Sequence, residues 1–329
     1  MDNNFSDAIR ISRVFCILFM SYVHLHILEP AGAEHDALTE IVSDTLGRSS
    51  VPLLSVISGY LMVSFFSRRS YLDALGKRFR SLIVPMIIWN GIAIALWGGS
   101  GINDLLALTG SSKLIYLTFL RDIFVMSALT PLLLGAARRS PLLLMGAITT
   151  IYLADLKTVL ILRPQIVFFY TAGVLLHVCP IPLRRNWAGP AIAALALISV
   201  ASAVWPTMND SHYFDALIKR PAASLGFWAL AMVSGRHLPA LARLDRHAFP
   251  FFLSHGVLFH ILGALYHRAE VLHFPAAYLI LWLSAPWICF LVAAATSCAL
   301  ERARLAVAGS GPGLNLAALA KSRRRTGRL

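Results

Sequence analysis

Charged residues are scarce in this chain. Only 14% of its 329 residues are Asp, Glu, Lys or Arg, whereas about 25% is usual in a soluble domain. Hydrophobic residues make up 57%, and the mean hydropathy is +0.69. A water-soluble fold would have to expose much of this apolar surface, so the composition excludes a soluble globular protein and predicts one that lies in a membrane.

Acidic residues are the scarcer of the two charge types. The chain has 16 of them against 29 Lys and Arg, which gives a formal net charge of +13. The basic residues cluster in short connections between apolar runs and at the C-terminus. This distribution is typical of the cytoplasmic side of membrane proteins rather than of a nucleic-acid-binding surface, so we expect no nucleic-acid partner.

Cysteine is also rare. The four cysteines, Cys16, Cys179, Cys289 and Cys298, lie in or beside apolar runs. Their spacing suits neither a zinc site nor a disulfide framework, so we interpret them as small packing residues and expect no metal.

Long apolar runs predict an all-α fold, a polytopic bundle of ten transmembrane helices. The runs cover residues 8–28, 50–66, 81–98, 114–136, 141–156, 164–178, 188–205, 219–235, 250–267 and 276–298. An even number of spans places both termini on one side. Placing them in the cytoplasm leaves 21 Lys and Arg inside and 7 outside, which predicts an N-in/C-in protein of the cell (inner, cytoplasmic) membrane.

Residues 1–300 are expected to form a single transmembrane domain. Residues 301–329 form a glycine-rich and then basic tail that we expect to be disordered and attracted to anionic lipid. The outer loop 29–49 is acidic, and it either covers a site that faces outward or is simply solvated.

Arg13 and His24 are the most informative pair in the sequence. Ionisable groups are expensive inside a membrane, and both lie in the first apolar run. Eleven residues are about three helical turns, so the two side chains are expected on one face, about 16 Å apart along the axis. Arg13 then suits an anionic donor at one surface, and His24 suits a general base near the other. The alternatives are an anchoring role at the membrane surface for Arg13 and a packing role for His24. Cleavage of a signal peptide near Ala31–Ala33 would remove both residues, but the acidic residues Asp2 and Asp7 make such a peptide unfavourable.

A basic cluster precedes the third apolar run. Lys77, Arg78 and Arg80 lie in the stretch SRRSYLDALGKRFRSLIVP, and Arg10 lies one turn before Arg13. Arginine grips phosphate bidentately, so these cations suit a phosphate-bearing donor such as coenzyme A. The alternative is that they only mark the cytoplasmic side.

Other polar residues lie at membrane depth. Ser58 and Gly59 permit close approach of a neighbouring helix, and Tyr60 offers a hydroxyl. Arg121 either lines a substrate path or neutralises a buried carboxylate. Its neighbour Asp122 points about 100° away on a helix, so the two need not pair.

The chain resembles the acyltransferase type 3 family of integral-membrane acyltransferases over essentially its whole length. Three elements carry the resemblance, in this order along the chain. Ten residues separate Arg13 from His24, and the segment VPLLSVISGYLM follows at residues 51–62. The segment KRFRSLIVP follows at residues 77–85, and in it Lys77 and Arg80 stand at the spacing of an arginine-x-x-arginine motif. FFLSH at residues 251–255 is similar to a late family element but lacks its tyrosine, and Glu301 resembles the family glutamate after the last helix.

The resemblance implies transfer of an acetyl or other short acyl group from cytoplasmic acyl-CoA to a hydroxyl of an exopolysaccharide or other surface glycan, with no bound cofactor. It implies His24 and Arg13 as catalytic residues, and donor binding by Arg10, Arg13, Lys77, Arg78 and Arg80. Substrate-binding candidates are Ser58, Tyr60, Arg121 and His255. Expected partners are acyl-CoA, a glycan or lipid-linked sugar acceptor, membrane lipids and polysaccharide-synthesis proteins.

Two other classes of function remain open from the sequence. A transporter or flippase of a polar or lipid-linked substrate would also place Arg and His inside the membrane, although the inverted repeats that favour one are not visible. A scaffold for a polysaccharide synthase would not need His24.

Overall fold

The computed structural model describes residues 3–25, 37–99, 101–180, 186–205, 207, 211–268 and 275–309. These residues form helices joined by loops, with no strand among them, which confirms the all-α prediction. The longer helices are α1 (Asn3–Tyr22), α3 (Arg48–Phe66), α5 (Val84–Trp97), α7 (Thr118–Arg139), α8 (Pro141–Leu153), α9 (Pro164–Val178), α10 (Ala188–Val204), α12 (Arg220–His237), α13 (Asp245–Arg268) and α14 (Pro275–Gly309). Shorter ones are α2 (Ala37–Thr39), α4 (Tyr71–Arg78), α6 (Ile102–Leu106) and α11 (His212–Phe214).

Each of the ten predicted segments overlaps one of the ten longer helices. Among the described residues, 6 helical stretches are long and apolar enough to cross a membrane. Helices α8, α9 and α10 are apolar but shorter, and α1 carries Asp7, Arg10 and Arg13. The chain is thus a multi-pass helical protein, and the count of ten spans and the N-in/C-in orientation remain predictions.

Two boundaries differ from the sequence-based expectation. Residues 37–47 of the predicted outer loop are helical and run directly into α3, because Leu38, Val42 and Leu46 recur every four residues and pack against the core. At the other end α14 continues to Gly309, so the predicted tail begins inside a helix; residues 26–36 and 310–329 lie outside the described residues.

The closest helix crossing joins α3 to α9. A Cβ added at Gly59 would lie 2.1 Å from the Tyr170 carbonyl oxygen, and one added at Gly173 would lie 2.1 Å from that of Val56. Only glycine fits at both points, so the predicted close approach at Ser58–Gly59 is confirmed.

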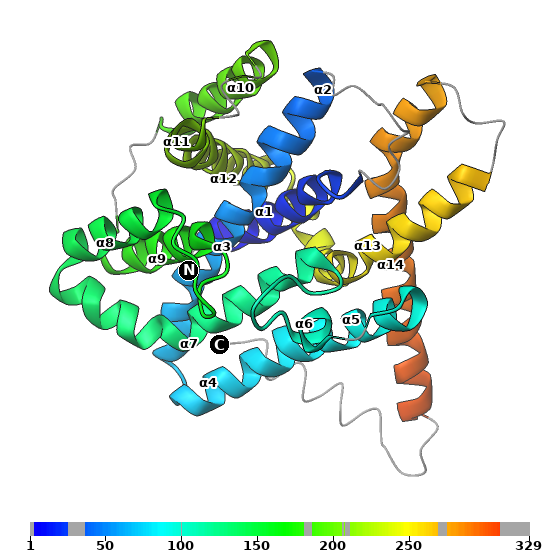
Figure 1. The fold of residues 1–329 in the computed structure, drawn as a ribbon, viewed down its shortest axis with the longest axis horizontal. Coiled ribbons are helices and arrows are strands. Elements are labelled where there is room, and N and C mark those ends of the chain that lie inside the picture. Colours follow the sequence, from blue (N-terminus) through cyan, green and yellow to red (C-terminus); the bar gives the residue numbers. More distant parts are fainter. Residues whose placement is uncertain are drawn as a thin grey trace.

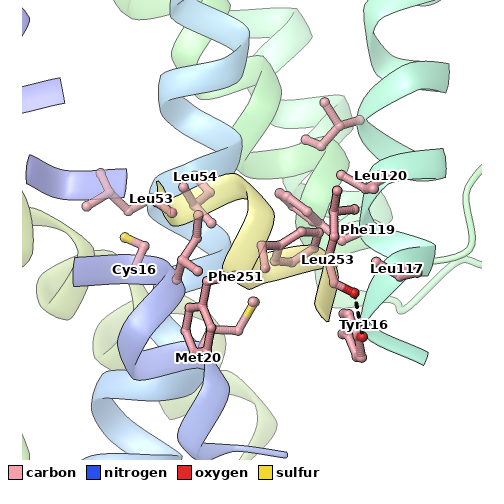
Figure 2. Packing of buried hydrophobic residues seen from close by; sticks show 14 of the residues in the cluster. Cys16, Met20, Leu53, Leu54, Tyr116, Leu117, Phe119, Leu120, Phe251 and Leu253 are labelled. Atoms are coloured by element: carbon pink, nitrogen blue, oxygen red, sulfur yellow. Dashed lines mark hydrogen bonds between the residues drawn. The ribbon is translucent and has the colours of Figure 1, made fainter. Parts of the chain in front are cut away.

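Helix α1 lies at the centre of the bundle, against α3, α12 and α13 (Figure 1). Its Cys16 and Met20 pack with Leu53 and Leu54 of α3 and with Phe251 of α13 (Figure 2). All four cysteines are free. Cys16 and Cys289 are buried, as the packing interpretation predicts, whereas Cys179 is exposed and the interpretation is wrong for it. Because α1 touches so many helices, residues at both of its ends are held by the surrounding bundle.

Candidate functional site

Arg13 is anchored by an acidic residue at the start of another helix. Its guanidinium contacts the carboxylate of Asp245, the first residue of α13. A carboxylate is favourable at a helix N-terminus, so Asp245 is itself held in place. The Arg13 side chain is 42% exposed and keeps donors for a further anion, whereas Arg10 pairs with Asp7 at 3.8 Å and is 52% exposed.

The side chains of the basic cluster Lys77, Arg78 and Arg80 differ in their exposure to solvent. Ser70 caps α4, which ends on Lys77 and Arg78. Arg78 is half-buried, with Nε 3.2 Å from Met62 Sδ and its guanidinium 5.6 Å from the Phe65 ring. Lys77 and Arg80 are exposed. Arg78 is therefore the member of the cluster that faces the bundle.

Helix α1 ends before His24. The predicted span reached residue 28, but α1 stops at Tyr22 and turns, with the His24 N–H donating to the Ser21 carbonyl at 3.1 Å. The Ser21 hydroxyl bonds back to the Leu18 carbonyl at 2.6 Å, a local hydrogen bond of the kind that weakens helix continuation. The prediction that His24 continues the helical face of Arg13 is therefore wrong in detail, because His24 lies in the turn that follows.

Three rings gather at this turn. The His24 ring centroid lies 5.4 Å from that of Tyr116 and 5.4 Å from that of His255, while Tyr116 and His255 are 4.0 Å apart. Tyr116 donates to the Leu253 carbonyl at 3.1 Å. Gly256 makes room for it, because a Cβ there would lie 2.5 Å from Tyr116 Cε1.

His255 is fully buried behind the other two rings. Its Nδ1 lies 2.8 Å from the Phe252 carbonyl oxygen, so Nδ1 carries the proton and Nε2 is left as the acceptor. This Nε2 is buried and has no hydrogen-bond partner among the described residues. His255 thus supports the ring cluster from inside the protein.

A cavity of about 300 Å³ opens beside His24. We call it the His24 cavity. Its lining combines apolar side chains with a histidine, a tyrosine, a glutamine and three arginines: Met20, Val23, His24, Gly47, Arg48, Val51, Ile115, Tyr116, Phe119, Arg163, Gln165 and Arg220.

Asp122 joins two arginines, one of which, Arg163, lines the His24 cavity. Arg121 Nη1 lies 3.0 Å from one carboxylate oxygen and Arg163 Nε lies 3.0 Å from the other. Arg121 also donates to the carbonyls of Leu108, Val159 and Leu160. Burial lowers the pKa of Arg163 while Asp122 opposes that shift, and the guanidinium remains charged.

The predicted site residues fall into separate places. His24 lines the cavity, and His255 does not line it but lies 5.4 Å from the His24 ring between centroids. Arg121 does pair with Asp122, because its long side chain spans the angle between neighbouring positions, and its substrate role stays a prediction. Tyr60 lies against Phe5 and His177, 5.7 and 4.9 Å between centroids, and Ser58 is half-buried on the same helix; neither lines the His24 cavity.

Sequence reasoning missed Tyr116 and the three cavity arginines. Arg48, Arg163 and Arg220 are three of the seven Lys and Arg that the predicted topology leaves outside, against the positive-inside trend. That departure from the trend was the available signal. Among the described residues no group of three or more His, Cys, Asp or Glu side chains could hold a metal ion.

Comparison with known proteins identifies the class. A family model described as an acyltransferase domain matches residues 6–300, so the chain belongs to the acyltransferase type 3 family and is a membrane acyltransferase. It is 26% identical over 335 residues to the succinoglycan biosynthesis protein ExoH of Rhizobium meliloti (strain 1021), covering 90% of this chain and 89% of that protein. No solved structure matches it.

Proposed function

We propose that this protein moves an acetyl or other short acyl group from cytoplasmic acyl-CoA to a hydroxyl of an exopolysaccharide or related surface glycan. The observation that carries the proposal is the position of His24. It lies at the wall of a cavity of about 300 Å³, eleven residues and about three helical turns beyond Arg13 and the basic surface around it.

The reaction needs one base and no redox step. The acceptor hydroxyl oxygen attacks the thioester carbonyl carbon, and His24 takes the hydroxyl proton. The C–S bond breaks as the tetrahedral intermediate collapses. His24 returns the proton to the departing sulfur, so the products are a sugar ester and free coenzyme A.

Arg13 and Arg78 are the donor-side residues that the geometry favours. Phosphate recognition by arginine is charge-assisted and bidentate, which suits the phosphates of coenzyme A. Arg13 is half-exposed and aimed by Asp245, and Arg78 faces the bundle. Lys77, Arg80 and Arg10 are exposed and would add mainly long-range attraction.

The glycan acceptor rests on similarity. ExoH is named as a protein of succinoglycan biosynthesis, and it aligns with most of this chain. The mixed lining of the His24 cavity supports a carbohydrate, since Tyr116 and Phe119 offer aromatic faces and Gln165 offers an amide.

Purified protein in lipid nanodiscs tests the proposal. We expect release of free coenzyme A thiol from acetyl-CoA or succinyl-CoA only when the surface glycan from a deletion strain is present, with mass spectrometry showing the ester on that glycan. Glycan uptake into vesicles without thiol release would contradict acyl transfer and support a transporter instead.

A further inference from the structure

The three arginines of the His24 cavity take no part in the reaction as proposed. Arg48 begins α3, Arg163 caps α9, and Arg220 begins α12, so three separate helices each bring a guanidinium to one cavity. Their side chains are 57%, 28% and 16% exposed, respectively. Such convergence needs a physical reason.

The ion pairs around the cavity leave positive charge in excess. Arg48 and Lys219 share Asp44, and Lys219 and Arg220 share Asp215. Arg121 and Arg163 share the single carboxylate of Asp122. These pairs join five cations to three carboxylates, and Arg121 and Arg163, which share one carboxylate, are 9% and 28% exposed. Unbalanced charge at low exposure is costly unless an anion completes it.

Three polar atoms of the lining residues lack hydrogen-bond partners among the described residues, namely Arg163 Nη2, Arg220 Nε and Gln165 Oε1. Arg163 Nη2 is a buried donor and Gln165 Oε1 is a buried acceptor, and Pro164 stands between the two residues in the sequence. Arg163 also stands at the N-cap of α9, where the helix dipole disfavours a cation and favours an anion. An anion bound beside Arg163 would satisfy its free donor and the helix end together.

We infer that the His24 cavity binds an anionic group of the substrate, a carboxylate or a phosphate, through Arg163, Arg48 and Arg220. The inference rests on the proposed function, because it names the chemistry of what His24 acts on. The charge has two possible sources. It belongs to the acceptor, as an acidic sugar or a phosphate that links the glycan to lipid, or to the acyl group, as the second carboxylate of a dicarboxylic acyl chain.

Direct binding tests the inference without requiring turnover. Glucuronate, inorganic phosphate, succinate and neutral glucose are titrated calorimetrically into the purified protein in nanodiscs. We expect at least one anion to bind about 10-fold or more tightly than glucose, as a charge-assisted hydrogen bond implies. Glucuronate or phosphate as the tightest ligand assigns the charge to the acceptor, and succinate assigns it to the acyl group.

Two variants locate the site. Arg163→Gln leaves Asp122 paired with Arg121, and Arg48→Gln leaves Asp44 paired with Lys219, so neither strands a carboxylate. Each is expected to weaken anion binding about 10-fold. Lys157→Gln is the matched control, because Lys157 is 61% exposed and pairs with Asp155 at the surface.

The outcomes separate this inference from the proposed function. Anions that bind no more tightly than glucose, or that bind both arginine variants as tightly as the wild type, overturn the inference. A protein that binds the anion through these arginines but transfers no acyl group to any glycan would support the inference of an anion site and contradict the proposed function.

Discussion

The imidazole rings of His24 and His255 lie 5.4 Å apart between centroids, although 231 positions separate them in the sequence. Tyr116 touches both rings and comes from a third part of the chain. His24 lines the cavity, whereas His255 is fully buried behind it. From this layering we propose that His24 carries the proton transfer and that His255 holds His24 in position.

His255→Phe tests the positioning role. The ring volume is nearly kept, so folding should survive, but the hydrogen bond from Nδ1–H to the Phe252 carbonyl, which fixes the ring, is lost. We expect kcat to fall about 10-fold with KM for acyl-CoA unchanged, because a small displacement of a catalytic group costs rate rather than donor binding. His267→Phe is the control, since His267 is exposed near the end of α13. Unchanged kcat in His255→Phe would leave His255 as a packing residue only.

Donor binding should depend on Arg13 more than on the exposed cations. We expect Arg13→Ala to weaken coenzyme A binding about 10-fold or more, Arg13→Lys less, and Arg80→Ala least, because the exposed charge is screened by salt. Calorimetric titration of coenzyme A measures this. Arg139→Ala, an exposed cation in the last turn of α7, is the control. Equal affinity in wild type and Arg13→Ala would remove the donor from this face.

Gly59→Ala should destabilise the bundle. The added methyl would meet the Tyr170 carbonyl oxygen at 2.1 Å, so α3 and α9 must separate. Overpacking of this kind costs about 1–3 kcal/mol, and we expect a lower unfolding temperature in detergent. Gly91→Ala on α5 is the matched control, with nothing within 4 Å of the added Cβ. A Gly59→Ala protein that melts with the wild type would show that the crossing is looser than the structure has it.

Apolar periodicity and residue spacing predicted much of the fold. They predicted the ten longer helices and the glycine crossing, because burial and helix geometry act locally along the chain. They missed the end of α1 before His24, because the apolar pattern continues to Leu28 while the backbone already turns at Val23 and His24. They also missed Tyr116 and the convergence of Arg48, Arg163 and Arg220, since those contacts join distant segments that no spacing relates.

In the proposed reaction, His24 takes the proton of the acceptor hydroxyl. The most direct measurement is the single-turnover rate of His24→Gln, a variant that keeps size and polarity but has no titratable nitrogen. We predict a fall of about 10²–10⁴ in acyl transfer, with coenzyme A affinity and unfolding temperature close to the wild type. A single-turnover rate within a few-fold of the wild type would contradict the claim.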